Sequence, residues 1–262
     1  MTKNVRTEVD INPVRLLLGE SVEFDDIVSI KVPTVREVID GKSSSLNSYI
    51  FNVSTRELFS ASREVDELEK RYPTVWEMMF DEENGGDFAL GRVLGIDYPA
   101  SALVMECFEY WTGLDKLGFK KLLNGKIIHE ESGWIVDKMK FKKFCEAIRK
   151  ITCYEPNEDF IAPKNMTDAR FNAWSKILKH RLKAAQRKKG NSLVDKILIL
   201  QASFDSYVSI EEIVSMSYFQ FNKLFKALNE KEGYLRNWEI MVSPKFDSSK
   251  TKLKHWTEKV HV

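Results

Sequence analysis

The segment SIEEIVSMSYFQFNKLFKALNEKEG, residues 209–233, carries the strongest structural signal in the chain. Ser209, followed three residues later by Glu212, forms a capping box, which is a signature of a helix N-terminus. Large apolar side chains then recur at spacings of three, four and three, on one face of a helix that we expect to end at Gly233. These side chains are Tyr218, Phe221, Phe225 and Leu228. Such a stripe belongs first of all to the protein's own core.

The rest of the chain is also rich in helix signals. Further capping boxes begin at Thr34, Ser54 and Thr74. Apolar periodicity predicts helices over 58–72, 138–152 and 168–189, and the apolar run 193–204 predicts a buried helix. In the helix over 138–152 we expect five residues to face inward: Met139, Phe141, Phe144, Cys145 and Ile148. In the helix over 168–189 the expected inward residues are Phe171, Trp174, Ile177, Leu178 and Leu182.

Two places have β character. Short branched runs at 14–19, 21–24 and 27–32, separated by turn residues, predict a small N-terminal β unit. Runs at 126–129 and 134–137 flank Glu-Glu-Ser-Gly and predict a β-hairpin near 126–137, with His129 on its surface. The fold class expected is therefore α+β and predominantly α-helical, with a small N-terminal β unit and a mid-chain β-hairpin beside helical bundles.

Proline placement suggests the domain organisation. Residues 153–168 contain Pro156 and Pro163 and form the best linker candidate. We expect residues 1–152 to hold the β unit, a helical lobe and the hairpin, and residues 169–262 to hold a basic helix and a C-terminal helical lobe.

The composition describes a globular chain with unevenly placed charge. Of its 262 residues 43% are hydrophobic, and the net charge is +1. No apolar run approaches the roughly 20 residues of a membrane span, and three cysteines make no disulfide framework, so we expect a cytoplasmic protein.

Residues 164–190 hold nine Lys or Arg and one Asp. This helix presents a candidate partner-binding basic face, formed by Lys179, Arg181, Lys183, Arg187, Lys188 and Lys189. Such a face can equally be solvated or compensated by the protein's own acidic half.

Sequence patterns typical of catalysis are missing. The four His and three Cys are scattered, without metal-ligand spacing, and the chain has no phosphate-binding loop or hydrolase nucleophile motif. Adjacent carboxylates such as Asp25-Asp26 and Glu211-Glu212 stand in turns or first helical turns, where negative charge is favourable. Each Cys is interpreted as a small buried hydrophobe. We therefore expect no enzymatic activity, no metal and no cofactor.

Several motifs together resemble a known family. Ile30–Val38 enters the first capped helix, Met216-Ser217-Tyr218-Phe219-Gln220-Phe221-Asn222 opens the C-terminal one, and Leu235-Arg236-Asn237-Trp238 precedes a Lys-rich stretch that ends at Trp256. This order resembles a largely uncharacterised family of tail- or morphogenesis-module proteins of tailed phages that infect Gram-positive bacteria. The chain departs from that family at 239–244, where the relatives have a Gly-rich stretch. None of the motifs is catalytic.

The resemblance implies a role in building the phage tail. The implied protein is a tail-assembly chaperone in the host cell cytoplasm that binds helical segments of a tail protein, either tape measure or tail tube. The candidate C-terminal motif then comprises Tyr218, Phe221, Trp238 and Trp256. Two alternatives stay open: a structural virion component of the baseplate or tail completion, and a nucleic-acid-binding regulator that uses the basic helix 170–189. The sequence has no helix-turn-helix signature and no aromatic RNA platform.

Overall fold

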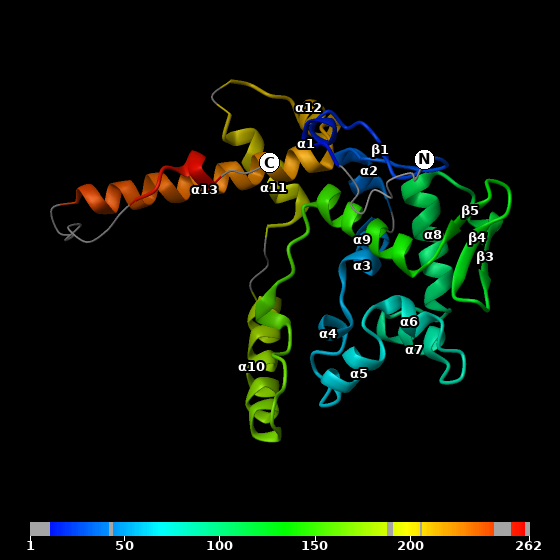
Figure 1. Cartoon of the computed structure of the whole chain (residues 1–262). Coiled ribbons are helices and arrows are strands. Elements are labelled where there is room, and N and C mark those ends of the chain that lie inside the picture. Colours follow the sequence, from blue (N-terminus) through cyan, green and yellow to red (C-terminus); the bar gives the residue numbers. More distant parts are fainter. Residues whose placement is uncertain (1–10, 42–43, 188–190, 205, 244–252, 260–262) are drawn as a thin grey trace, which may run out of the picture. The chain divides into compact units, whose positions relative to one another are not determined.

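The computed structural model describes residues 11–41, 44–187, 191–204, 206–243 and 253–259 (Figure 1). The chain divides into two compact units. Among the described residues, unit 1 comprises 22–31 and 44–187, and unit 2 comprises 11–21, 32–41 and 191–259. The expected fold class is confirmed, because helices dominate and the strands form two small sheets. Within the described ranges no helix is long and apolar enough to cross a membrane.

Unit 1 combines helices with both sheets. Its strands are β1 (Val22–Glu23), β2 (Ser29–Ile30), β3 (Phe119–Leu122), β4 (Lys126–His129) and β5 (Trp134–Val136). Its α-helices are α3 (Ser44–Asn52), α4 (Thr55–Leu58), α5 (Val65–Arg71), α6 (Val75–Met79), α7 (Gly86–Val93), α8 (Ala100–Thr112), α9 (Lys138–Thr152) and α10 (Asp168–Arg187). Two 3-10 turns, η1 (Lys116–Gly118) and η2 (Glu158–Phe160), complete it.

An aromatic cluster forms the centre of unit 1. The rings of Phe51 from α3 and Phe108 from α8 stack with centroids 5.9 Å apart, and Phe144 from α9 meets both edge-on. Trp134 from β5 closes the cluster against Phe108 at 5.2 Å. All four side chains are fully buried. These contacts explain why α3 packs against both α8 and α9.

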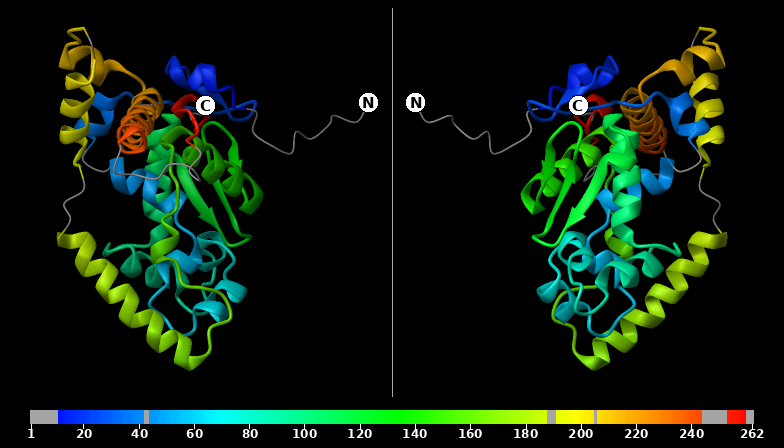
Figure 2. Two further views of the ribbon diagram at one scale, coloured as in Figure 1. Left: turned by 90° about the vertical axis from the view of Figure 1, so that its left-hand side faces the viewer. Right: turned by 90° about the vertical axis from the view of Figure 1, so that its right-hand side faces the viewer.

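The predicted hairpin is confirmed and is part of a larger sheet. β4 and β5 pair antiparallel, and β3, which the sequence analysis missed, pairs with the other edge of β4 (Figure 2). The Lys-Lys pair inside β3 hides its strand character. His129 was expected on the surface, but it is buried: its Nε2 donates to the Asp115 carbonyl at 3.1 Å, and Nδ1 accepts from the Ser132 backbone N–H at 3.2 Å.

The predicted helix over 58–72 is wrong. α4 ends at Leu58 and α5 begins at Val65, because the intervening turn receives the chain around Ala162. Ser60 fixes this turn: its hydroxyl donates to the Arg56 carbonyl at 2.7 Å and accepts from the Ala162 N–H at 3.2 Å. The Ser54 capping box is only half formed, since the carboxylate of Glu57 accepts from the Tyr154 hydroxyl at 2.8 Å instead.

Two other helices of unit 1 follow their predicted patterns in part. α9 has the predicted bounds, and Phe141, Phe144, Cys145 and Ile148 are buried as expected, whereas Met139 is 60% exposed. In α10 Phe171, Trp174 and Leu178 are buried, but Ile177 and Leu182 are 46% and 47% exposed. The buried line is narrow because α10 covers only a small cluster around Val65 and Ala162.

The compact units divide the chain differently from the predicted boundary. Residues 153–168, proposed as a linker, contain η2 and the buried Ala162, and α10 groups with unit 1 rather than with the C-terminal lobe. The physical cause is the anchorage of α10, since the indole N–H of Trp174 donates to the Ser60 carbonyl at 2.9 Å.

Unit 2 is helical. It contains α1 (Pro13–Leu17), α2 (Val35–Asp40), α11 (Leu193–Ala202), α12 (Ile210–Ser215), α13 (Tyr218–Val242) and the 3-10 turn η3 (Trp256–Lys259). The first run of the predicted β unit is wrong, because Asn12 caps a helix there and Pro13 occupies its first turn; only β1 and β2 remain of that unit. The Thr34 and Ser209 capping boxes are confirmed. The buried helix expected over 193–204 is α11, which buries only Ile197 and Leu200.

The last helix is longer than the sequence pattern predicts. α13 continues through Gly233, where we expected it to end, and reaches Val242. A glycine inside a helix costs about 1 kcal/mol relative to alanine. Contacts hold the helix on both sides of Gly233: Glu230 pairs with Lys259, and Tyr234 meets the His255 ring. Residues 33–35 anchor the start of the helix: the Tyr218 N–H donates to the Pro33 carbonyl at 2.7 Å, and the Val35 N–H to the Met216 carbonyl at 3.0 Å.

Candidate partner-binding surfaces

The basic face of α10 is smaller than the sequence suggested. Lys179, Lys183 and Arg187 are exposed to solvent. Arg181 is engaged inside unit 1: its Nη2 lies 2.9 Å from a carboxylate oxygen of Asp159, and its guanidinium also donates to the Asp159 carbonyl and covers the Trp174 ring. The two remaining members of the predicted face, Lys188 and Lys189, lie outside the described residues.

The four residues of the predicted C-terminal motif divide into two kinds. Phe221 is fully buried in the core of unit 2, and Tyr218 packs against that core. Both are structural. Trp238, in contrast, is 51% exposed on α13, and Trp256 lies at the start of η3, beside α13. Trp238 is therefore the clearly exposed residue of the four, whereas Tyr218 and Trp256 are both partly buried.

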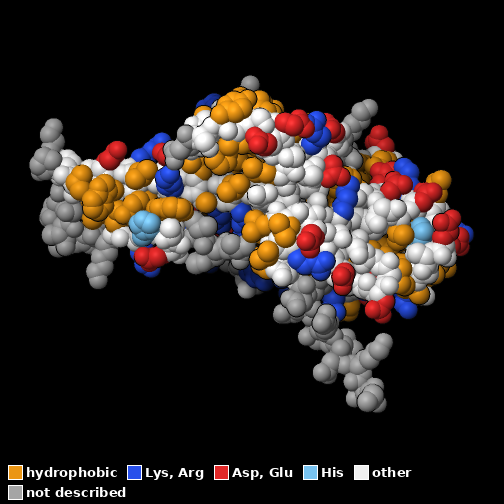
Figure 3. Space-filling view, turned by 90° about the horizontal axis from the view of Figure 1, so that it is seen from above, with side chains coloured by type: hydrophobic (Ala, Val, Ile, Leu, Met, Phe, Trp, Pro, Cys, Tyr) orange, Lys and Arg blue, Asp and Glu red, His pale blue; other side chains and the backbone are white. Residues whose placement is uncertain are grey.

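A regular line of side chains, apolar except for Lys231, runs along α13, and we name this line the α13 seam. Its members stand at spacings of four, three, four, three and four, the heptad spacing of helices that pack side by side. They are Leu224, Leu228, Lys231, Leu235, Trp238 and Val242. The first half packs against the core that includes Leu200 of α11. The second half is uncovered, with Leu235, Trp238 and Val242 exposed by 42%, 51% and 60%. The space-filling view shows hydrophobic side chains gathered on the surface of the arm that α13 forms (Figure 3).

A pocket of about 230 Å³ opens where the covered half of the seam ends. Its lining includes Leu200 and Phe204 from α11 and the residues after it, Leu224 and Leu228 from α13, and Trp256 from η3. Lys231 is the charged residue of the lining. Contacts between η3 and α13 hold this wall in place: Lys259 pairs with Glu230 at 3.3 Å, and the His255 ring meets Tyr234 at 4.9 Å.

Neither the pocket nor the seam was among the sites predicted from the sequence. The signal was present in the heptad spacing from Leu224 to Val242, but it was cut in two by the expectation that Gly233 ends the helix. The pocket has no comparable signal, because its walls come from segments that are distant along the chain.

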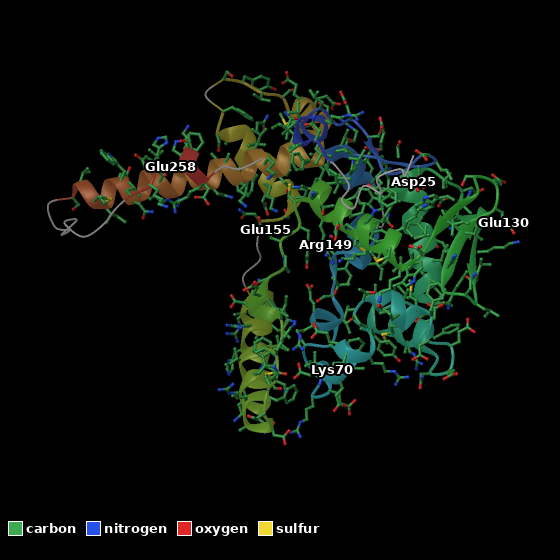
Figure 4. The ribbon with its side chains drawn as sticks, viewed as in Figure 1. Asp25, Lys70, Glu130, Arg149, Glu155 and Glu258 are labelled. Carbon is green, nitrogen blue, oxygen red and sulfur yellow. The ribbon has the colours of Figure 1, made fainter. Side chains whose placement is uncertain are left out.

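The titratable groups singled out in the sequence have structural partners. Asp25, labelled in Figure 4, has a carboxylate that accepts hydrogen bonds from the Trp134 indole at 2.9 Å and from Lys140 Nζ at 2.8 Å. Burial opposes its ionisation, but these bonds, led by that of Lys140, leave the pKa of Asp25 lowered. Glu212 completes the cap at Ser209. Burial raises the pKa of Cys145 to about 12 and that of Cys107 well above its usual value, which is typical of structural thiols. Within the described ranges no three His, Cys, Asp or Glu side chains form a group that could hold a metal ion.

Fold and surface together define the class: a predominantly helical protein with exposed apolar side chains and a small pocket on its last helix. One comparison with known proteins gives a match. Residues 185–261 match the family model described as the YomV second domain, a phage-derived family. The match spans α11, α12, α13 and η3, and so the whole pocket and seam. It supports a phage origin for the chain. No curated protein and no solved structure matches.

Proposed function

We propose that this protein is a non-enzymatic phage morphogenesis protein, a tail-assembly chaperone that holds helical segments of a tape-measure or tail-tube protein in the host cytoplasm. The observation that carries the proposal is the uncovered half of the α13 seam. It lies inside the segment that matches the phage-derived family. The resemblance of the C-terminal motifs to tail-module proteins supplies the tail as the place of action.

The two halves of the seam are alike in spacing and in apolar character. α11 packs on the first half, which shows that this heptad line accepts a helix. The second half has the same spacing, and its three apolar side chains are about half exposed. A helix laid over Leu235, Trp238 and Val242 would stabilise the complex by about 1 kcal/mol for each side chain that becomes buried. A chaperone needs such moderate affinity, because it must release its client.

Capture from infected cells tests the proposal. The tagged full-length protein is purified under mild conditions, and the eluate is analysed by mass spectrometry and by its absorbance ratio for nucleic acid. We expect a tail protein without nucleic acid, and at least a fivefold loss of that protein with Trp238→Ala. Ile240→Ala is the matched control, because Ile240 is equally exposed, at 51%, on the opposite side of α13. Equal capture by both variants contradicts the proposal.

A second experiment separates the chaperone from a structural virion component. A chaperone leaves when the tail is complete, so purified particles should lack this protein by mass spectrometry. Its presence at a fixed number of copies in each particle would favour a baseplate or tail-completion role instead.

One observation favours nucleic acid as a second candidate partner. Lys179, Lys183 and Arg187 form an exposed cationic line on α10. Binding through phosphate contacts would fall steeply as the salt concentration rises. Charge reversal at Arg187, Lys188 and Lys189 should leave folding intact and weaken any contact that uses this face. Unchanged binding of every captured partner would remove the basic face from the mechanism.

A further inference from the structure

We propose that the pocket beside Trp256 is the anchor site for the partner helix, and that it takes one large apolar side chain whose neighbouring carboxylate pairs with Lys231. This inference rests on the proposed function and specifies which helical segments the protein accepts. It makes the pocket, rather than the seam alone, the feature that selects the client.

The size and lining of the pocket fit one side chain. An apolar cavity of about 150 Å³ can hold a benzene ring. A space of about 230 Å³ therefore has room for a Leu, Phe or Trp side chain. Its walls, which include Leu200, Phe204, Leu228 and Trp256, are apolar and aromatic. An aromatic anchor would gain ring contacts with Trp256 in addition to burial of its surface.

The position of the pocket fits a helix rather than an isolated ligand. Leu228 and Lys231 belong both to the pocket lining and to the α13 seam. From Leu228 to Val242 the seam extends over fourteen residue steps, about 21 Å of helix. A partner helix of about four turns can therefore place its anchor in the pocket and rest its remaining apolar residues on Leu235, Trp238 and Val242.

The charges along α13 define the rest of the occupant. Lys231 is exposed and has no ion-pair partner among the described residues, whereas the adjacent Glu230 is paired with Lys259. An acidic side chain beside the anchor would complement Lys231. Glu232 and Glu239 lie along one flank of the seam, also without ion pairs in the described part of the chain. Basic residues on the facing edge of the partner helix would complement them.

The same charges disfavour a second copy of this chain as the occupant. In an antiparallel pair of α13 helices, the flanks that carry Glu232 and Glu239 would face each other. In a parallel pair, the two copies of Lys231 would meet in the seam. Like charges brought together in an interface cost several kcal/mol. A different helix, with an acidic residue near its anchor and a basic edge, avoids both conflicts.

A synthetic peptide tests the inference on the full-length protein. The probe is a fluorescein-labelled helical peptide of sixteen residues with apolar residues at alternating spacings of three and four. It carries one Phe anchor, a Glu one turn away and Lys along one edge. Binding is followed by fluorescence anisotropy. We expect the dissociation constant to rise about tenfold when the Phe is replaced by Ala, and about tenfold for the protein variant Lys231→Glu.

Charge rescue and matched controls make the result specific. A peptide with Lys in place of the Glu should bind Lys231→Glu as tightly as the original pair binds. Arg236→Glu is the charge-reversal control, since Arg236 lies on the same helix but away from the pocket, and its effect should stay within twofold. Ala227→Phe, which narrows the pocket from its lining, should also weaken binding about tenfold while the circular dichroism spectrum stays unchanged.

The outcomes separate the inference from the proposed function. If Lys231→Glu and Ala227→Phe both bind the peptide like the unaltered protein, the anchor site is overturned, even where infected cells still yield a tail protein. If the peptide binds as expected but no tail protein is captured, the proposed function fails and the anchor site stands. Sedimentation that shows a dimer dissociated by Trp238→Ala would overturn the inference in favour of a second copy.

Discussion

Replacing Arg56 by alanine should destabilise unit 1 by about 3–5 kcal/mol, the usual cost of breaking a buried ion pair from one side. Arg56 is only 5% exposed and joins three segments. Its guanidinium donates to Glu69, at 3.0 Å from Nε and 2.6 Å from Nη2, and to Asp66. Its Nη1 donates to the carbonyls of Ala162 and Pro163, at 3.1 and 3.0 Å.

The magnitude follows from what the substitution leaves behind. Hydrogen bonds to charged groups contribute about 1.5–3 kcal/mol each. The side chains of Asp66 and Glu69 are 26% and 31% exposed, so water can replace part of what they lose. The carbonyl of the buried Ala162 gains no such access, which costs about 1–3 kcal/mol more. Arg56→Lys keeps the positive charge but not the planar set of donors. We expect its loss of stability to fall in the lower half of the range of about 3–5 kcal/mol.

Chemical denaturation of the full chain, combined with hydrogen exchange over 158–178, measures the effect. Exchange in that region reports the release of the 160s segment and α10 specifically. Arg63→Ala is the matched control, because Arg63 is 62% exposed and stands 3.9 Å from Asp168. Exposed ion pairs of this kind contribute about 0–1 kcal/mol. A loss below about 1 kcal/mol for Arg56→Ala, or an equal loss for both variants, would refute the reasoning.

The pH dependence gives an independent check. The hydrogen bond from Arg56 lowers the pKa of Asp66 and that of Glu69 in the folded state. A carboxyl with a lowered folded pKa contributes stability above its unfolded pKa, near 4, and loses it as the pH falls through the folded value. The stability difference between the unaltered protein and Arg56→Ala should therefore shrink below about pH 4. A difference that stays constant between pH 7 and pH 3 would show that Arg56 acts only through packing.

Three further predictions follow from single contacts in unit 1. Gly118→Ala should destabilise the protein by about 1–3 kcal/mol, measured by urea denaturation, because the added Cβ would lie 2.4 Å from His129 Nε2. An unchanged stability would mean that the His129 ring can move aside. Iodoacetamide at pH 8 should not modify Cys145 in the native protein, because burial raises the pKa of this thiol to about 12. Labelled Cys145 in mass spectrometry of the digest would contradict this prediction. Tyr72→Phe removes a hydroxyl that donates to Asp81, so it should raise the pKa of Asp81 from about 2 toward its usual 3.8. An NMR titration that finds the same pKa in the variant would assign the low pKa to the other partners of Asp81.

Local signals predicted the elements that local chemistry controls. The capping boxes at Thr34, Thr74 and Ser209 each begin a helix, because a side-chain cap acts within one turn of the residues that form it. α9 has its predicted bounds because its apolar period is unbroken between Asp137, which caps it, and Cys153. The hairpin of β4 and β5 was equally readable from its turn.

Errors occurred where distant segments override the local pattern. The periodicity over 58–72 is helical, yet Ser60 and Arg56 bond to the chain near Ala162 and open a turn there. His129 stands in a strand that looks half exposed, but the carbonyl of Asp115 satisfies its ring and allows it to be buried. Glycine often ends a helix, but α13 continues through Gly233 to Val242, and the segment 255–259 contacts it on both sides of that residue, at Glu230 and Tyr234.

The candidate site shows the same division. By itself the sequence determined the helical class, the basic character of α10 and the heptad spacing on α13, because each depends on residues within a few turns of one another. Only the tertiary structure decided that Arg181 is bound to Asp159, that Phe221 is core while Trp238 is exposed, and that Trp256 closes a pocket over Leu228. Burial depends on which distant segment covers a side chain, and no local spacing encodes that choice.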